Sequence, residues 1–262
     1  VYAKAMPNNC VFLVDTYDSL AGVRHAVAVG AQLRAGGHRM IGIRLDSGDL
    51  AYLSIEARRI LDEAGFPEAV IVASNNLDEN VIASLKQQGA TIGVWGVGTQ
   101  LATAFDEPAL GGIFKLTAIR DHVRDPWTYR LKLSEQVNKI SIPGVLQVRR
   151  FSKGGEFIAD VIYDEQAGLP DPLVAVDPSD STRRKSIPAD AVGSDLLVPV
   201  LREGRRVIDL PPLMESRRRC QDQLAGFHAG IKRLVNPHDY PAGVAENLFE
   251  LRNRMILELK RP

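Results

Sequence analysis

The chain has 262 residues, of which 45% are hydrophobic and 24% are charged, a composition typical of globular proteins with a substantial core. Its 32 Lys and Arg residues balance 32 Asp and Glu residues, so no overall field would attract nucleic acid or an anionic membrane. No apolar stretch approaches the roughly 20 residues that a membrane span requires, and no signal-peptide pattern stands near residue 1. We therefore expect a soluble, cytoplasmic protein that binds neither nucleic acid nor membranes.

The two cysteines, Cys10 and Cys220, are far apart and form no CxxC motif, so the sequence predicts neither a disulfide framework nor a zinc site. Cys10 opens the apolar run 10–14 and is expected in the core. The chain begins at Val1 without a methionine, and a buried-type strand follows soon after. We therefore expect the chain to be the middle of a longer polypeptide.

The first part of the chain alternates buried-type strands with helical stretches. Each apolar run leads into a polar loop, a helix and a glycine stop, and this unit recurs in steps of roughly 25 residues. The pattern predicts strands at 10–14, 40–43, 70–73 and 91–95, with helices at 20–34, 50–64 and between 78 and 89. Such repeats are typical of parallel βαβ units, whose sites lie at the carboxyl ends of the strands. We expect the four loops after the strands to line one cleft.

From about Trp127 the pattern changes to short, partly alternating strands separated by glycine and proline turns. It predicts strands at 127–131, 145–149, 157–163, 196–201 and 205–208, a loop over 165–195, and helices at 212–234 and 244–260. The fold class is therefore α/β, with an antiparallel accessory sheet and C-terminal helices after the parallel part. We expect one domain over 1–122 and a second over 123–262.

The loop Arg44-Leu-Asp46-Ser47-Gly48-Asp49 is the most specific element. Arginine offers a planar fork for phosphate or carboxylate, and carboxylates bind ribose hydroxyls or a Mg²⁺ ion carried by a polyphosphate. The alternative is helix capping by Ser47 or Asp46, with Asp49 favouring the helix dipole. Capping does not explain an arginine facing two acids at a strand end, so we interpret Arg44 and Asp46 as functional and leave Asp49 open between the two roles.

The other three loops also carry candidates. The segment Gly96-Val-Gly98-Thr99 presents two glycines and a hydroxyl at a helix start, which favours a phosphate site. Asp15 and Ser74 stand at strand ends and are expected to face the site. Asp18 and Asp78 precede predicted helices and are expected to be their N-caps. We assign no role to Lys115, His25 or His38.

Seven motifs, taken in order, resemble the nicotinate phosphoribosyltransferase family. They are DTYD at 15–18, GIRLDSGDL at 42–50, ASNNLDE at 73–79, GVGT at 96–99, KLSE at 132–135, PG at 143–144 and PHDY at 237–240. GIRLDSGDL is the most diagnostic of these. The resemblance runs from about residue 6 to the end and is weakest over 165–195.

The resemblance implies part of an irregular α/β barrel that transfers ribose 5-phosphate from PRPP to nicotinate. It also implies a requirement for Mg²⁺ and coupling to ATP hydrolysis through a phosphorylated histidine. Arg44 would hold nicotinate or PRPP, Asp46 would contact the ribose, and both would be catalytic. The remaining candidates for substrate binding are Asp15, Ser47, Gly48, Asp49, Ser74 and Asn75. The candidates for phosphate binding are Gly96, Gly98 and Thr99. Mg²⁺ would arrive with PRPP, and Asp46 or Asp49 is a candidate protein ligand for it.

The family's N-terminal half is not matched by this chain, so the phosphorylated histidine and the aromatic that stacks on the pyridine are expected on other polypeptide. We expect a homodimer or pairing with a chain that supplies that half. Two alternatives stay open. The first is a non-catalytic partial barrel or subunit. The second is another sugar-phosphate barrel enzyme, such as an aldolase, although none of the four loops offers a lysine for a Schiff base.

Overall fold

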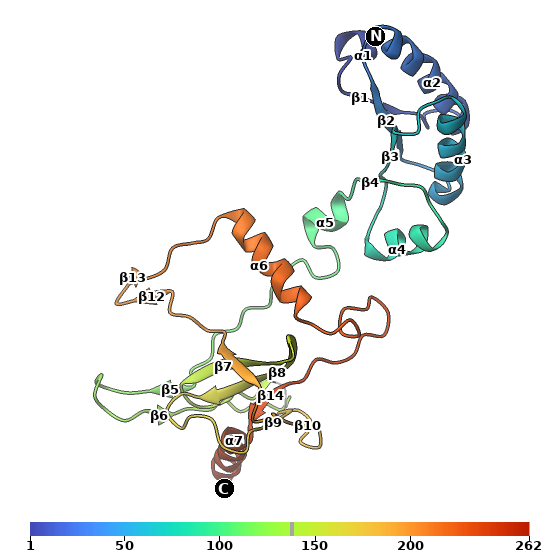
Figure 1. Cartoon of the computed structure of the whole chain (residues 1–262). Helices are drawn as coiled ribbons and strands as arrows, with labels where there is room; N and C mark the ends of the chain where they lie inside the picture. Colours follow the sequence, from blue (N-terminus) through green and yellow to red (C-terminus); the bar gives the residue numbers. More distant parts are fainter. Residues whose placement is uncertain (137–138, 262) are drawn as a thin grey trace. The chain divides into compact units, whose positions relative to one another are not determined.

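The computed structural model describes residues 1–136 and 139–261, and the chain divides into two compact units, Val1–Gly111 and Gly112–Pro262 (Figure 1). Residues 112–122 group with the second unit, so this division lies earlier than the expected boundary after residue 122. Within the described ranges, no helix combines the length and apolar character needed to cross a membrane.

The first unit is an open parallel sheet with helical connections. Its strands pair in the order β1-β2-β3-β4, all parallel, which confirms the predicted βαβ repeat. The elements in chain order are α1 (Tyr2–Ala5), β1 (Cys10–Leu13), α2 (Ser19–Ala35), β2 (Met40–Leu45), α3 (Leu50–Glu63), β3 (Val70–Ala73), α4 (Glu79–Gln87), β4 (Val94–Trp95) and α5 (Thr99–Thr103).

The fourth strand is shorter than the predicted span 91–95. Its first predicted residue, Thr91, is bound to α3 instead of β3: the Thr91 hydroxyl donates to the Ser54 carbonyl at 2.7 Å, and its amide donates to the Ser54 hydroxyl at 3.2 Å. Strand pairing with β3 is limited to Val94 and Trp95, flanked by single bonds from the Gly93 amide to the Ile71 carbonyl at 3.0 Å and from the Gly96 amide to the Ala73 carbonyl. At Thr91, hydrogen bonds to Ser54 of α3 take the place of the strand pairing that the apolar run predicted.

The core of the first unit lies between the sheet and the helices α2 and α3, which lie side by side (Figure 1). Cys10 is fully buried there, as predicted. Its fully buried neighbours include Val23, Ile43, Leu45 and Leu61. Gly22 of α2 allows a very close approach to the end of β1, because a Cβ at this position would lie 2.0 Å from the Val14 carbonyl oxygen.

Aspartates cap the three longer helices of this unit. The side chains of Asp18, Asp49 and Asp78 accept hydrogen bonds from the backbone amides of Ala21, Tyr52 and Val81, respectively. The two expected caps, Asp18 and Asp78, are therefore confirmed. For α3 the cap is Asp49, because the helix begins at Leu50, one residue after it. The capping alternative had instead favoured Ser47 or Asp46.

The second unit is built on a six-stranded mixed sheet. The strand order is β10-β9-β14-β8-β7-β11, in which only the β14–β8 pair is parallel. The elements are β5 (Ala118–Ile119), β6 (Thr128–Tyr129), β7 (Leu146–Lys153), β8 (Glu156–Asp164), β9 (Val174–Val176), β10 (Arg184–Ser186), β11 (Val192–Asp195), β12 (Leu201–Arg202), β13 (Arg205–Arg206), α6 (Leu213–Ala225), β14 (Ala242–Ala245) and α7 (Glu246–Leu259). Helix α7 packs against β9 and β14 beneath the sheet (Figure 1).

Several predictions for this unit are wrong in detail. The expected strand 196–201 is present only at Leu201, in β12, and the first two residues of the expected helix 244–260 belong to β14. The expected loop 165–195 contains β9, β10 and β11; β10 and β11 are exposed strands at the two sheet edges, so they lack an apolar pattern. The expected helix 212–234 ends at Ala225, because the next carbonyl, of Gly226, accepts a hydrogen bond from the Phe157 amide at 2.7 Å.

Arg150 links α6 to the second sheet. Its guanidinium donates to both carboxylate oxygens of Asp160, at 2.8 and 2.7 Å, and to the Gln223 side chain of α6 at 2.7 Å. The Tyr240 hydroxyl also donates to Asp160, at 2.8 Å. Burial, followed by this bond to Asp160, raises the pKa of Tyr240 above its usual range, so the phenol stays a donor throughout the physiological range.

Candidate functional site

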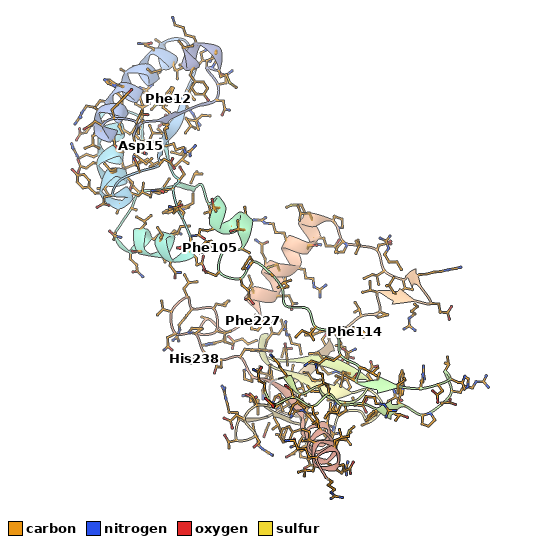
Figure 2. All side chains as sticks on the ribbon, turned by 180° about the vertical axis from the view of Figure 1, so that it is seen from behind. Phe12, Asp15, Phe105, Phe114, Phe227 and His238 are labelled. Atoms are coloured by element: carbon orange, nitrogen blue, oxygen red, sulfur yellow. The ribbon has the colours of Figure 1, made fainter. Side chains whose placement is uncertain are left out.

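Asp15 joins the loop after β1 to the loop after β2. One oxygen of its carboxylate accepts hydrogen bonds from the Asp46 backbone amide and from the Ser47 hydroxyl, both at 2.7 Å. A carboxylate that accepts two donors from a neighbouring loop fixes the path of that loop. Asp15 therefore braces the second loop from the first; Figure 2 shows it beyond Phe12 at the carboxyl end of β1.

Ser74 joins the loop after β2 to the end of β3. Its hydroxyl accepts a hydrogen bond from Arg44 Nε at 2.7 Å and donates one to Asp46 Oδ1 at 2.5 Å. The second terminal nitrogen of Arg44, Nη2, lies 3.6 Å from the same Asp46 oxygen. We call the connected residues Arg44, Ser74 and Asp46 the polar relay.

The relay is buried at its centre and open at its ends. Ser74 is 7% exposed, while the side chains of Arg44 and Asp46 are 48% and 42% exposed. An ion pair this exposed contributes little to stability, because water screens it and ordering the side chains costs entropy. The arrangement instead leaves a guanidinium edge and a carboxylate in reach of a ligand, which are groups suited to an anion and to a hydroxyl.

Backbone hydrogen bonds align the four loops at one end of the sheet. The Val14 amide donates to the Arg44 carbonyl at 3.2 Å, the Ser74 amide to the Leu45 carbonyl at 2.9 Å, and the Gly96 amide to the Ala73 carbonyl at 2.7 Å. The parallel ladder thus continues one residue beyond β1, β3 and β4. The four loops therefore lie at the same end of the sheet, as predicted; that they line one cleft stays a prediction.

The fourth loop meets the relay at Gly96. A Cβ on Gly96 would lie 3.2 Å from the Ser74 Cβ, a contact that a side chain could make only if Ser74 shifted. Gly98 and Thr99 are exposed at the start of α5, and neither is hydrogen-bonded to the relay. A cavity of about 500 Å³ lies beside them and is lined by Asp78, Val97 and Leu101, among others, instead of by Arg44 or Asp46.

The remaining candidates have local backbone roles. Gly48 adopts a positive φ of 78° in the turn before α3, where Asp49 serves as the cap. Asn75 has a φ of 108°, which is rare for a residue with a side chain. Its side-chain oxygen accepts from the following amide, of Asn76, at 2.8 Å. Such strain next to Ser74 places an exposed amide at the edge of the relay, the kind of feature that gathers at functional sites.

The sequence pattern did not reveal that Asp15 and Ser74 bind to other site residues. Each makes hydrogen bonds to residues about 30 positions away in the chain, and such partners become neighbours only when the strands pair. Lys115, whose role was open, donates to the Lys139 carbonyl at 3.0 Å in the second unit. Among the described residues, no group of three or more His, Cys, Asp or Glu side chains is placed to hold a metal ion.

Comparisons with known proteins agree on one family. Residues 147–252, from β7 into α7, match the model of the nicotinate phosphoribosyltransferase C-terminal domain. The chain is 39% identical to nicotinate phosphoribosyltransferase of Bacillus subtilis (strain 168), over 96% of this chain and 52% of that protein. It is 37% identical to nicotinate phosphoribosyltransferase 2 of Arabidopsis thaliana, over 95% of this chain and 46% of that protein.

A solved structure, that of human nicotinic acid phosphoribosyltransferase, matches 97% of this chain and 48% of its own length, with a TM-score of 0.72 and 27% identity. The chain is similar to nicotinate phosphoribosyltransferases over nearly its whole length. It spans about half the length of the curated relatives it matches. The relay lies in the first unit, outside the stretch that matches the C-terminal domain.

Proposed function

We propose that the chain carries the phosphoribosyl-binding part of an enzyme that makes nicotinate mononucleotide and pyrophosphate from nicotinate and PRPP, with ATP as co-substrate. The observation that carries the proposal is the polar relay, which holds a guanidinium and a carboxylate together at the carboxyl ends of four parallel strands. The reaction is inferred from the similarity to nicotinate phosphoribosyltransferases. The relay contributes side chains that suit a phosphorylated sugar.

Each site residue has a role in this proposal. Arg44 binds an anionic group of PRPP or nicotinate, and Asp46 accepts a hydrogen bond from a ribose hydroxyl. Gly96, Gly98 and Thr99 hold the 5-phosphate through backbone amides and a hydroxyl. The exposed residues of the neighbouring loops complete the substrate site, namely Ser47, Gly48, Asp49 and Asn75.

The reaction develops positive charge at C1 of the ribose and negative charge on the leaving pyrophosphate. Groups fixed in advance stabilise such charge better than water does, because they need not reorganise during the reaction. The fixed orientation of Arg44 and Asp46 provides this, with the carboxylate near the sugar and the guanidinium near an anion. Arg44, once bound to an anion, also shields it from solvent.

Mg²⁺ fits this site as an ion that arrives with PRPP. It commonly binds to one or two carboxylates and to substrate phosphates, and keeps several waters, which agrees with the absence of a larger cluster in the described residues. In this proposal Asp46 contributes a carboxylate oxygen, since its side chain is 42% exposed beside Arg44, whereas Asp49 caps α3. Mg²⁺ would supply charge neutralisation on the pyrophosphate.

We also propose that the β1–β4 sheet is part of a larger, irregular barrel. Its two outer strands, β1 and β4, each pair on one side only, and the relatives are about twice as long as this chain. A second polypeptide stretch that continues the sheet would supply the phosphorylated histidine and the stacking aromatic. A homodimer, or pairing with such a stretch, stays part of the proposal.

The experiment is an assay of the purified chain with nicotinate, PRPP, ATP and Mg²⁺, alone and after addition of the N-terminal half of a family member. We expect no measurable nicotinate mononucleotide from the chain alone and turnover from the mixture. Arg44→Ala in the mixture is the control for turnover at this site. Turnover by the chain free of any other polypeptide, or by the mixture with Arg44→Ala at the unaltered rate, would contradict the proposal.

A further inference from the structure

Ser74 is one of two buried polar residues in the first unit; the other is Ser54 of α3. A buried hydroxyl needs hydrogen-bond partners, because losing water without replacement is costly. Ser54 finds its partners within helix α3 and at Thr91. Ser74 finds both of its partners in the side chains of Arg44 and Asp46.

The direction of these two bonds is fixed by chemistry. Arg44 Nε can only donate, so the Ser74 oxygen accepts from it. The single Ser74 proton then points to Asp46 Oδ1, which accepts it as an ionised carboxylate at 2.5 Å. The Ser74 hydroxyl therefore connects the Arg44 guanidinium to the Asp46 carboxylate. Both of these side chains have several rotatable bonds and are nearly half exposed, so the hydroxyl limits their freedom.

We propose that Ser74 is a positioning residue, which sets the orientation of Arg44 and Asp46 toward substrate without touching substrate itself. The inference rests on the proposed function, since it assigns Ser74 a part in the same site. Ser74 engages Nε, and Asp46 Oδ1 lies 3.6 Å from Nη2, which leaves Nη1 to bind an anion. Ser74 thereby moves from the substrate-binding group, where the strand-end position had placed it, to the support of that group.

Gly96 adds an independent constraint on the position of Ser74. Because a Cβ at residue 96 would lie only 3.2 Å from the Ser74 Cβ and 3.4 Å from the Ala73 carbonyl oxygen, a side chain there would press on the end of β3. The fourth loop thus lies close against the Ser74 side chain, at a position where only a glycine fits without a shift. Gly96→Ala should weaken the relay although it removes no polar group.

The test compares three variants of the full chain: Ser74→Ala, Ser74→Thr and, as a matched control, Ser54→Ala. The first readout is the ¹⁵N–¹H signal of Arg44 Nε, identified by its loss in Arg44→Lys. The second is PRPP binding in Mg²⁺, measured by calorimetry, beside a thermal melt of each variant. Loss of a charge-assisted hydrogen bond weakens an interaction by on the order of 10-fold, and we expect Ser74→Ala to weaken PRPP binding by about that factor.

We expect the Arg44 Nε signal to be protected from exchange in the unaltered chain and in Ser74→Thr, and lost in Ser74→Ala. Ser54→Ala should lower the melting temperature while leaving the signal and PRPP binding intact. An unchanged Arg44 signal in Ser74→Ala, or equal weakening of PRPP binding by Ser54→Ala, would overturn the positioning role. Failure of the unaltered chain to bind PRPP would count against the proposed function instead, and the Nε signal then decides on Ser74 by itself.

Discussion

Arg44 is the last residue but one of β2, and its neighbours Ile43 and Leu45 are fully buried, yet its own side chain is nearly half exposed. A charged residue in such a place either binds something or braces the loop. Its guanidinium spans Ser74 and Asp46, so bracing accounts for one edge of the group. The terminal edge is what the proposed function assigns to substrate.

Replacing Arg44 by lysine separates these two roles. Lysine keeps the positive charge but loses the planar, two-pronged geometry, and a charge-assisted contact of this kind contributes roughly 1.5–3 kcal/mol. We expect kcat/KM of an active preparation to fall by on the order of 10–100-fold, with little change in the melting temperature. Steady-state kinetics beside a thermal melt provide the measurement. Unchanged kinetics with a lowered melting temperature would show that Arg44 only braces the loop.

At the residue scale, the sequence indicated which side chains have functional chemistry, but it did not indicate which residues they bind. The order Arg-Leu-Asp-Ser-Gly-Asp after an apolar run marked Arg44 and Asp46, because such a mixture has no use in a core. The same letters could not show which acid caps α3, since Asp46, Ser47 and Asp49 all have capping side chains. That choice depended on where α3 starts, a boundary that shifts easily by one or two residues.

At the element scale, the buried carboxylate of Asp164 links the β5–β6 pair to the six-stranded sheet. Asp164, 2% exposed at the end of β8, accepts from the Tyr129 hydroxyl of β6 and from the Val145 amide at 2.9 Å. Burial, followed by the hydrogen bond to Asp164, raises the pKa of Tyr129 to about 12. The ordinary pKa of a tyrosine is about 10, so folding favours the protonated phenol.

This shift predicts a pH-dependent contribution to stability. A raised pKa in the folded state stabilises the protein fully below about pH 10, and the contribution is lost as the pH rises toward about 12. The difference in unfolding free energy between the unaltered chain and Tyr129→Phe should therefore be largest below pH 10 and should shrink above it. Urea titrations followed by Trp127 fluorescence in a Trp95→Phe background would measure it.

Tyr17→Phe is the matched control, because Tyr17 is fully exposed in the first unit and lies outside this network. It should show no pH-dependent difference in the Trp127 transition. A Tyr129→Phe difference that stays constant from pH 8 to 12 would mean that the Asp164 bond does not hold the phenol in its protonated form.

The strands of the first unit were more predictable than those of the second. Strands β1, β2 and β3 are short apolar runs between glycine stops, and the sequence placed all three within one or two residues. Strands β9 to β11 were not predicted, because a three-residue strand or an exposed edge strand shows no alternation. Closure into a barrel is likewise beyond a pattern that specifies strands and connections but not the number of neighbours each strand acquires.

At the scale of the whole molecule, each unit has a core of its own. The first unit holds one cluster of buried residues and the second holds two, and none of the three clusters combines residues from both units. The stretch between these cores carries large apolar side chains that are exposed, among them Phe105 at 63%, Leu110 at 99% and Phe114 at 98% (Figure 2). Exposed chain of this kind is where proteases act first.

Limited digestion with chymotrypsin should therefore cut between residues 105 and 114 before it reaches either core. We expect the first unit to survive as one resistant piece, identified by mass spectrometry, because its own core needs no residue from the second. A variant with alanine at Phe105, Leu110 and Phe114 should release this piece much more slowly. Early cleavage at Phe66, a residue only 4% exposed in the first core, would contradict independent folding of the unit.

The contact between Gly22 and Val14 makes the site sensitive to a residue that never approaches substrate. Val14 immediately precedes Asp15, and its carbonyl occupies the space where any side chain at position 22 would begin. Helix α2 could accommodate even an alanine only by moving away from the strand end, and Asp15 would move with its backbone. Under the proposed function, a substitution at position 22 would lower activity while leaving every polar group of the site in the sequence, so a screen restricted to site residues would miss it.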